Sequence, residues 1–267
     1  MGLPDAPPDR NLMARNRNRL TTSLRTARAM VGHRRSGRRD FALATVLAAI
    51  AGAANAGGFF AVGKYTSHMT GYLSQLADNI AILNWLAALV ACLAIAAFVT
   101  GAAFSTLLIN GTRQVNHRHQ YALTLAVQGV FLFLFSFGGL FTTPAGRMFS
   151  LACLCFIMGM QNATITKISG ARVRTTHATG MVTDIGIEIG RAVGVGVFRF
   201  GGTPADGRKL TVLISLVFAF FAGGIVGAVG FGRFGFFFSL PLSVILLGVS
   251  IPTLIMDQPP PKTGTPT

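Results

Sequence analysis

Six stretches of this sequence are each long and apolar enough to cross a lipid bilayer as a helix, which requires about 20 predominantly apolar residues. They cover residues 41–62, 84–110, 120–141, 148–167, 210–231 and 235–255. Only 12% of the residues are charged, far fewer than in a soluble domain. Because unpaired backbone groups are costly in lipid, we expect an all-α fold, a polytopic transmembrane helix bundle.

A hexapeptide motif occurs once in each half of the chain. Thr66–Gly71 (TSHMTG) returns as Thr175–Gly180 (TTHATG). Two further matches occur in the same order: residues 52–56 resemble 159–163, and Phe98 with Gly101 resembles Phe221 with Gly224. These matches predict two transmembrane repeats, residues 41–141 and 147–256.

Two shorter helical stretches begin at the hexapeptides, at about residues 69–83 and 178–198. Both contain several polar or charged residues, so neither resembles a lipid-facing span. If both are re-entrant or broken helices, three basic loops all lie in the cytoplasm, as the positive-inside rule favours: those around Arg113, around Arg172 and around Arg208. If both cross the membrane instead, the first two of these loops, around Arg113 and Arg172, move outside.

The favoured arrangement has six full spans and two partial ones, with three full spans in each repeat. Because three is odd, the repeats are inserted in opposite orientations, which is a common architecture of secondary transporters.

Residues 1–40 contain ten Arg and three Asp and form an Arg-rich cytoplasmic tail, and residues 257–267 form a Pro-rich C-terminal tail. A basic stretch beside a first span is more often a topology signal than a nucleic-acid site, so no nucleic-acid partner is expected.

The hexapeptides are candidate substrate-binding motifs because each precedes a helix. A Thr or Ser there caps the first free amides, and a nearby glycine allows a ligand to approach closely. Two helix N-termini facing each other inside the membrane would attract an anion or a carboxylate. The alternative is that both motifs only cap helices and pack tightly. The candidate binding residues are Asn55, Ser67, His68, Thr70, Gly71, Asn162, Thr176, His177, Thr179 and Gly180.

Asn55 and Asn162 lie near the ends of the spans that precede the two hexapeptides. An amide at this place either coordinates a ligand or holds the broken backbone in position, and the second role is favoured. For His68 and His177 a functional role is favoured, because an ionisable group inside a membrane is costly.

The second repeat also carries a candidate site for a coupling ion or proton. Asp184, Glu188 and Arg191 fall on one face of a helix, so Glu188 can pair with Arg191 and leave Asp184 free to bind a proton or a cation. The alternative is a helix at the aqueous edge of the membrane whose charges only face water.

No motif indicates catalysis, a metal or a cofactor, so we expect a protein that is not an enzyme. An intramembrane enzyme needs a nucleophile or a carboxylate pair poised across two helices, whereas Asp184 and Glu188 lie on one helix. His117 and His119 have no neighbouring carboxylate or cysteine, which makes a metal site a poor interpretation. Gly223 and Gly227 have the GxxxG spacing typical of close helix packing.

Between about residues 41 and 255 the chain resembles the YoaK-like family, a group of multi-pass bacterial membrane proteins classed as a domain of unknown function. The resemblance rests on residues 67–71, 159–163 and 176–180. The family commonly has an acidic residue where this chain has Asn55, and often Asn where it has Tyr72. The resemblance implies a protein of the bacterial inner membrane but no particular substrate.

Together these patterns favour a transporter or permease for a small polar or anionic solute. We expect the lipid bilayer and a small-molecule solute as partners. We also expect a cytoplasmic N-terminus, and the protein could form a homo-oligomer. The alternative is a non-transporting membrane sensor, anchor or assembly protein that acts through its basic N-terminal tail.

Overall fold

The computed structural model describes residues 37–116, 119–140, 143–168, 178–198 and 202–255, and every regular element within them is helical. The α-helices are α2 (Gly37–Val62), α3 (Met69–Ala81), α4 (Trp85–Val115), α5 (Gln120–Phe135), α6 (Pro144–Ile168), α7 (Ala178–Gly196), α8 (Gly207–Phe234) and α9 (Ser239–Ile255). Two short 3₁₀ helices, η1 (Ser136–Leu140) and η2 (Gly235–Phe238), follow α5 and α8. The expected all-α fold is confirmed. Nearly all of the predicted Arg-rich tail and the C-terminal tail lie outside the described residues.

Five helical runs within the described residues are long and apolar enough to cross a membrane. They are Phe41–Phe60, Trp85–Val115, Gln120–Leu140, Pro144–Lys167 and Gly207–Ile255. The last run has 49 residues and contains both α8 and α9, which the sequence predicted as two separate spans. Gly235 separates the two helices with a φ of 55°, a left-handed conformation that glycine adopts without strain.

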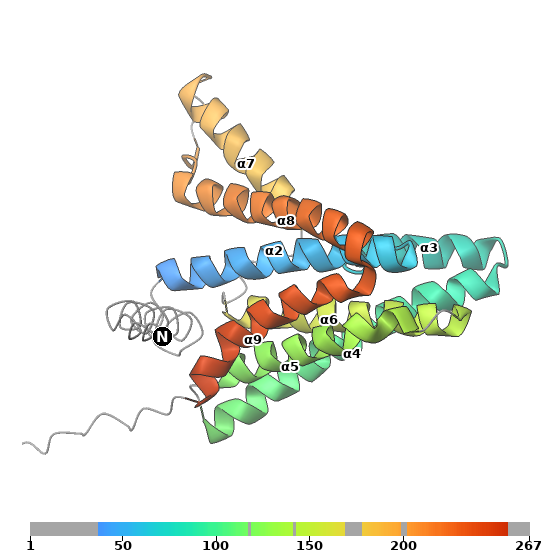
Figure 1. Cartoon of the computed structure of the whole chain (residues 1–267). Helices are drawn as coiled ribbons and strands as arrows, with labels where there is room; N and C mark the ends of the chain where they lie inside the picture. The colour runs from blue at the N-terminus through green and yellow to red at the C-terminus, as the bar shows by residue number, and fades with distance from the viewer. Residues whose placement is uncertain (1–36, 117–118, 141–142, 169–177, 199–201, 256–267) are drawn as a thin grey trace, which may run out of the picture.

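The two short helices α3 and α7 are not among these candidate spans. With 13 residues, α3 is about 20 Å long, too short for a hydrocarbon core of about 30 Å. Helix α7 has 19 residues but carries Asp184, Glu188 and Arg191. Figure 1 shows α3 extending to the right-hand end of the molecule, while α7 projects away from the other helices at the upper left.

Each half of the chain supplies one helix to each of two closely packed pairs. Helix α2 packs along α8, and α4 packs along α6. In both pairs the helices run in the same direction, and the α2–α8 direction is opposite to that of α4–α6 (Figure 1). Helices α5 and α9 form a third pair between the halves.

Glycines bring the backbones of each pair into direct contact. A Cβ atom at Gly52 of α2 would overlap the carbonyl oxygen of Phe220 of α8, and one at Gly223 would overlap that of Ala49. The α4–α6 pair has matching contacts, because Cβ atoms at Gly159 and Gly101 would overlap the carbonyl oxygens of Phe98 and Phe156, respectively. We call these two contact lines the glycine seams.

The glycine seams confirm one prediction and correct another. Gly223 and Gly227, which have GxxxG spacing, both lie against the backbone of α2, as expected for close packing. The predicted equivalence of Gly101 with Gly224 is wrong by one residue, because Gly223 makes the matching contact and Gly224 only approaches Gly52. A one-residue shift turns a helix by about 100°, so the sequence match alone did not resolve which glycine faces the seam.

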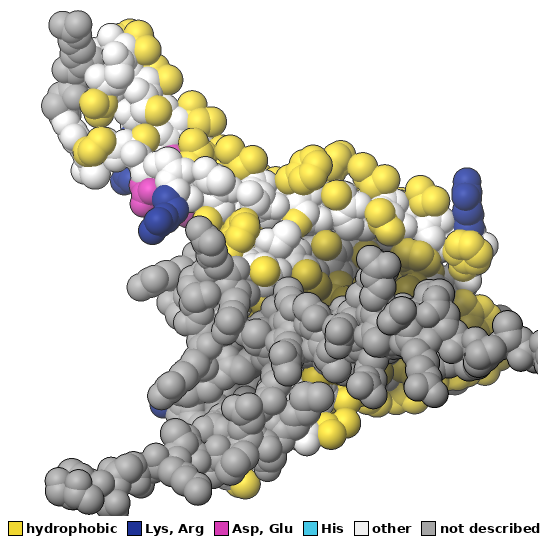
Figure 2. All heavy atoms as spheres, turned by 60° about the vertical axis from the view of Figure 1, so that its left-hand side comes forward, with side chains coloured by type: hydrophobic (Ala, Val, Ile, Leu, Met, Phe, Trp, Pro, Cys, Tyr) yellow, Lys and Arg dark blue, Asp and Glu magenta, His cyan; other side chains and the backbone are white. Residues whose placement is uncertain are grey.

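Buried polar side chains also join the helices. The amide nitrogen of Gln161 donates to the Leu47 carbonyl at 2.7 Å, and the Ser243 hydroxyl donates to the Gly129 carbonyl at 2.7 Å. Such bonds are typical of helices that pack inside a membrane. Many large apolar side chains are exposed, among them Leu107, Phe218 and Val244, and Figure 2 shows apolar side chains spread over the described surface. Together these features indicate a multi-pass membrane protein.

The glycine seams give a stability prediction. Gly159→Ala places a methyl group against the Phe98 carbonyl, so we expect it to lower the free energy of unfolding by about 1–3 kcal/mol. The measurement is the Tm of the purified protein in detergent. Gly248→Ala is the matched control, because a Cβ at Gly248 of α9 would meet no atom within 4 Å. Equal Tm values for the two variants would contradict the close approach of α4 and α6.

Candidate functional site

A cavity of about 740 Å³ lies where the two halves of the chain meet. From the first half, Asn55 of α2 lines it together with Ser67, His68 and Thr70 at the start of α3. From the second half, Asn162 of α6 and Thr179 at the start of α7 line it. The structure therefore brings the described parts of both hexapeptides, and both asparagines, to one space.

The cavity lies midway along two of the long helices. Phe98 of α4 and Phe220 of α8 both line it, and each is near the middle of its helix. Their carbonyl oxygens are the ones that contact Gly159 and Gly52 in the glycine seams. If the helices cross a bilayer, this position places the cavity near the midplane, where transporters bind their substrates.

Asn55 holds the chain segment that leads into α3. Its Oδ1 accepts hydrogen bonds from the backbone N–H of Thr66, the backbone N–H of Ser67 and the hydroxyl of Ser67, each at 3.0 Å. One amide oxygen thus satisfies two backbone donors of a non-helical segment. This is the structural role that the sequence favoured, and Asn55 is also one of the cavity-lining residues.

The expected capping of α3 by a Thr or Ser side chain is wrong. The N-cap residue is His68, and its side chain makes no capping hydrogen bond. The Ser67 hydroxyl donates to Asn55 Oδ1 instead. Within the described chain, the first-turn N–H groups of Thr70 and Gly71 have no hydrogen-bond acceptor. The beginning of α3 therefore keeps free donors beside the cavity.

The two motif glycines are not among the cavity-lining residues. Gly71 instead gives space to the His68 imidazole, because a Cβ at Gly71 would overlap that ring. Gly180 is exposed in the first turn of α7. Thr176 and His177 lie outside the described residues, so their predicted roles remain predictions.

Several lining residues were missed from the sequence. Among them are Tyr65, Thr106, Thr166, Lys167 and Phe220. Thr106 and Phe220 lie within long apolar runs, where only the packing of the helices decides which face meets the cavity. The sequence repeat pairs Phe98 with Phe221, whereas the lining residue is Phe220, one position earlier.

Basic and neutral polar groups, without carboxylates, line the described part of the cavity. Lys167 is the one lysine or arginine in the lining, and its Nζ donates to the Asn110 side-chain oxygen at 3.1 Å. His68 and Tyr65 are the other ionisable side chains there. No Asp or Glu is among the lining residues. Within the described chain, no group of three or more His, Cys, Asp or Glu residues could hold a metal.

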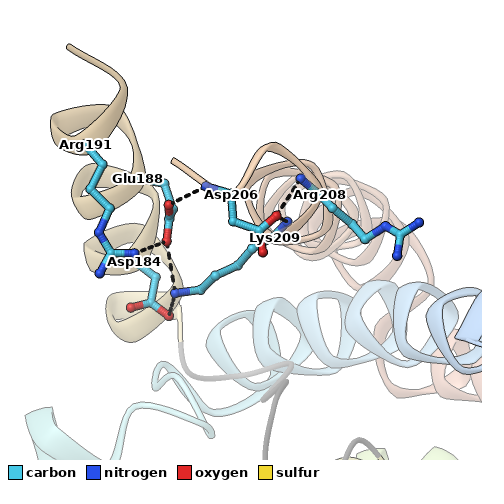
Figure 3. A network of polar contacts seen from close by, with 6 residues as sticks. All are labelled: Asp184, Glu188, Arg191, Asp206, Arg208 and Lys209. Atoms are coloured by element: carbon cyan, nitrogen blue, oxygen red, sulfur yellow. Dashed lines mark hydrogen bonds and ion pairs between the residues drawn. The ribbon is translucent and has the colours of Figure 1, made fainter. Parts of the chain in front are cut away.

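The proposed ion-coupling residues lie elsewhere, where α7 meets the beginning of α8 (Figure 3). Arg191 Nη1 lies 3.0 Å from Glu188 Oε1, which is the expected pair. The prediction that Asp184 is left free is wrong, because Lys209 Nζ lies 3.6 Å from its Oδ2 and 3.3 Å from Glu188 Oε1. The sequence did not reveal this contact because Lys209 comes from the next helix.

The same network fixes the first turn of α8. The backbone N–H of Asp206 donates to Glu188 Oε2 at 3.0 Å, and Asp206 Oδ1 accepts from the N–H groups of Arg208 and Lys209. The Asp206 N–H and, after it, Lys209 and Arg191 hold the pKa of the Glu188 carboxyl below its usual range, although the side chain is fully buried. Figure 2 shows these acidic and basic side chains together at the base of α7. The arrangement is that of a structural link between α7 and α8.

The apolar helices and the shared cavity define the class as a multi-pass membrane protein. The chain matches the family described as "Protein of unknown function (DUF1275)" over residues 43–251. Because this match covers most of the chain, the protein belongs to the DUF1275 family. The match is consistent with the resemblance to the YoaK-like family. No curated protein and no solved structure matches the chain.

The role of Asn55 gives a second prediction. Asn55→Ala leaves the N–H groups of Thr66 and Ser67 without their acceptor, so we expect a loss of about 1–3 kcal/mol in unfolding free energy and faster trypsin cleavage after Lys64. Asn55→Asp keeps an acceptor oxygen in place and serves as the matched control, with cleavage close to wild type. Equal protease resistance of Asn55→Ala and wild type would contradict the anchoring role.

Proposed function

We propose that this protein is a transporter or permease for a small polar or anionic solute, built from two inverted repeats with six full spans and two broken helices. The observation that carries the proposal is the cavity at mid-length of α4 and α8, into which the first turns of both short helices lead. Polar helix ends inside an otherwise apolar bundle are typical of secondary-transporter substrate sites. The proposal involves no chemical conversion of the solute.

Three features of the packing support an inverted duplication. The pairs α2–α8 and α4–α6 have equivalent glycine contacts, with one helix of each pair from each half of the chain. The first helices of the two halves, α2 and α6, run in opposite directions (Figure 1). Helices α3 and α7 also leave the cavity in opposite directions, and each packs on the following helix, α4 or α8.

We further propose a bacterial inner-membrane location with a cytoplasmic N-terminus. In this topology α3 enters from the outer side and α7 from the cytoplasmic side, so the two broken helices reach the cavity from opposite faces. The basic segments around Arg113 and Arg208 then both lie in the cytoplasm, as the positive-inside rule requires.

Transport is tested with the purified full-length protein in proteoliposomes. Uptake is compared with empty liposomes for labelled small anions and neutral polar solutes. Thr179→Trp places a large side chain in the cavity, and we expect it to reduce the initial rate at least about tenfold by excluding the solute. Thr183→Trp is the matched control, because Thr183 is exposed one turn later on α7 and is not a lining residue. No uptake above empty liposomes for any of these solutes, or equal rates in both variants, would contradict the proposal.

Topology is tested with single cysteines in a cysteine-free background. Two cysteines lie on the predicted cytoplasmic side, Val115→Cys and Thr203→Cys. Two lie on the predicted outer side, Ile82→Cys and Leu140→Cys. All four sites are exposed. We expect a membrane-impermeant thiol reagent to label only the second two in intact cells and all four after permeabilisation. Labelling of Val115→Cys in intact cells would contradict the inverted arrangement.

Removal of residues 1–36 should leave transport intact, whereas a protein acting through its tail would lose its function.

A further inference from the structure

We infer that the solute is a small organic anion with one carboxylate and an apolar part. This inference rests on the proposed transport function and narrows the solute to one chemical class. It is carried by the charges of the cavity lining and by the separation of polar and apolar groups within it.

Carboxylates are scarce in the helical part of the chain, and the structure places them away from the cavity. Residues 41–255 contain Asp78, Asp184, Glu188 and Asp206 as their only acids. Three of these belong to the α7–α8 network, in which Glu188 and Asp184 already contact cations. Asp78 is exposed on α3 and is not a lining residue. A cationic solute would therefore find no counter-charge among the described lining residues, and its desolvation would go uncompensated.

Lys167 supplies the opposite charge. It lines the cavity at the end of α6, its ammonium donates to the neutral side chain of Asn110, and within the described chain that ammonium makes no ion pair. A charge that only a neutral group contacts is available to a ligand anion, and the surrounding apolar helices strengthen that attraction relative to water.

The polar lining matches the hydrogen bonds of a carboxylate. The Asn162 amide and the hydroxyls of Thr70 and Thr179 line the cavity, and the backbone N–H of Thr70 has no acceptor within the described chain. A carboxylate has two oxygens that only accept hydrogen bonds, so it can use several such donors at once. A neutral alcohol can use fewer of them.

The apolar lining comes from the two middle helices. Phe98 and Phe220 line the cavity from α4 and α8, and both pack against the buried cluster of Ala51, Ala54 and Met158. The glycine seams hold the backbone of each phenylalanine in place, so their rings form a preformed apolar surface. A solute that carries only a charged group would leave this surface in contact with water. An apolar part attached to the carboxylate would cover it.

Binding is tested with benzoate as the probe, using isothermal titration calorimetry on the purified full-length protein in detergent. Benzylamine replaces the anion by a cation on the same ring, benzyl alcohol replaces it by a neutral group, and acetate removes the ring. Titration into Thr179→Trp, in which an indole takes up space in the cavity, gives the background from detergent partitioning. We expect benzoate to bind at least about tenfold more tightly than each of the other three compounds.

Two sets of variants test which residues carry this preference. Lys167→Gln should weaken benzoate binding about fivefold, whereas Lys64→Gln, which also removes a lysine that contacts an amide oxygen but lies outside the lining, should not. Phe98→Leu and Phe220→Leu should each weaken benzoate binding about fivefold and leave acetate binding unchanged. Phe218→Leu is the matched control, because Phe218 is 67% exposed on α8.

The possible results separate this inference from the proposed function. Equal binding of benzylamine and benzoate, acetate binding as tight as that of benzoate, or no benzoate binding above background would each overturn the inference. Benzoate binding without uptake in proteoliposomes would support the ligand class and count against transport. Uptake of a neutral polar solute by a protein that does not bind benzoate would support transport and overturn the inference.

Discussion

The close backbone contact in the two glycine seams is the constraint on which the rest of the structure depends. Gly52 and Gly223 let α2 and α8 meet without intervening side chains, and Gly101 and Gly159 do the same for α4 and α6. Inside a membrane the hydrophobic effect does not drive helices together, so the dispersion contacts allowed by small residues take its place. Because each seam joins one helix from each half of the chain, neither half can form its main contacts alone.

The cavity follows from these seams. The carbonyl groups that rest on Gly159 and Gly52 belong to Phe98 and Phe220, and these side chains line the space between the two pairs. Asn55 then fixes the segment before α3 with three hydrogen bonds, which places the beginning of that helix at the same space. The cavity therefore combines rigid apolar walls with free hydrogen-bond donors, and the long-range packing determines both.

The two charged regions of the second half have different roles. The network of Asp184, Glu188, Arg191 and Lys209 is internally paired and ties α7 to α8. Lys167, in contrast, reaches the cavity and contacts a neutral amide. The sequence predicted the Glu188–Arg191 pair, because residues three apart share a helix face. It did not predict that Lys209 closes the network, because that contact depends on how α7 lies against α8.

The sequence by itself determined the helical class, the long apolar spans, the two short polar helices and the two motifs from which they begin. These are local properties, set by runs of apolar residues and by the periodicity of a helix. Only the tertiary structure decided that the described parts of both motifs and both asparagines meet at one cavity, that Phe220 rather than Phe221 faces it, and that Asp184 is paired. A helix presents a new face with each residue, and an apolar helix in a membrane has apolar residues on all faces. The choice of the inward face therefore depends on the partner helix, which in this protein comes from the other half of the chain.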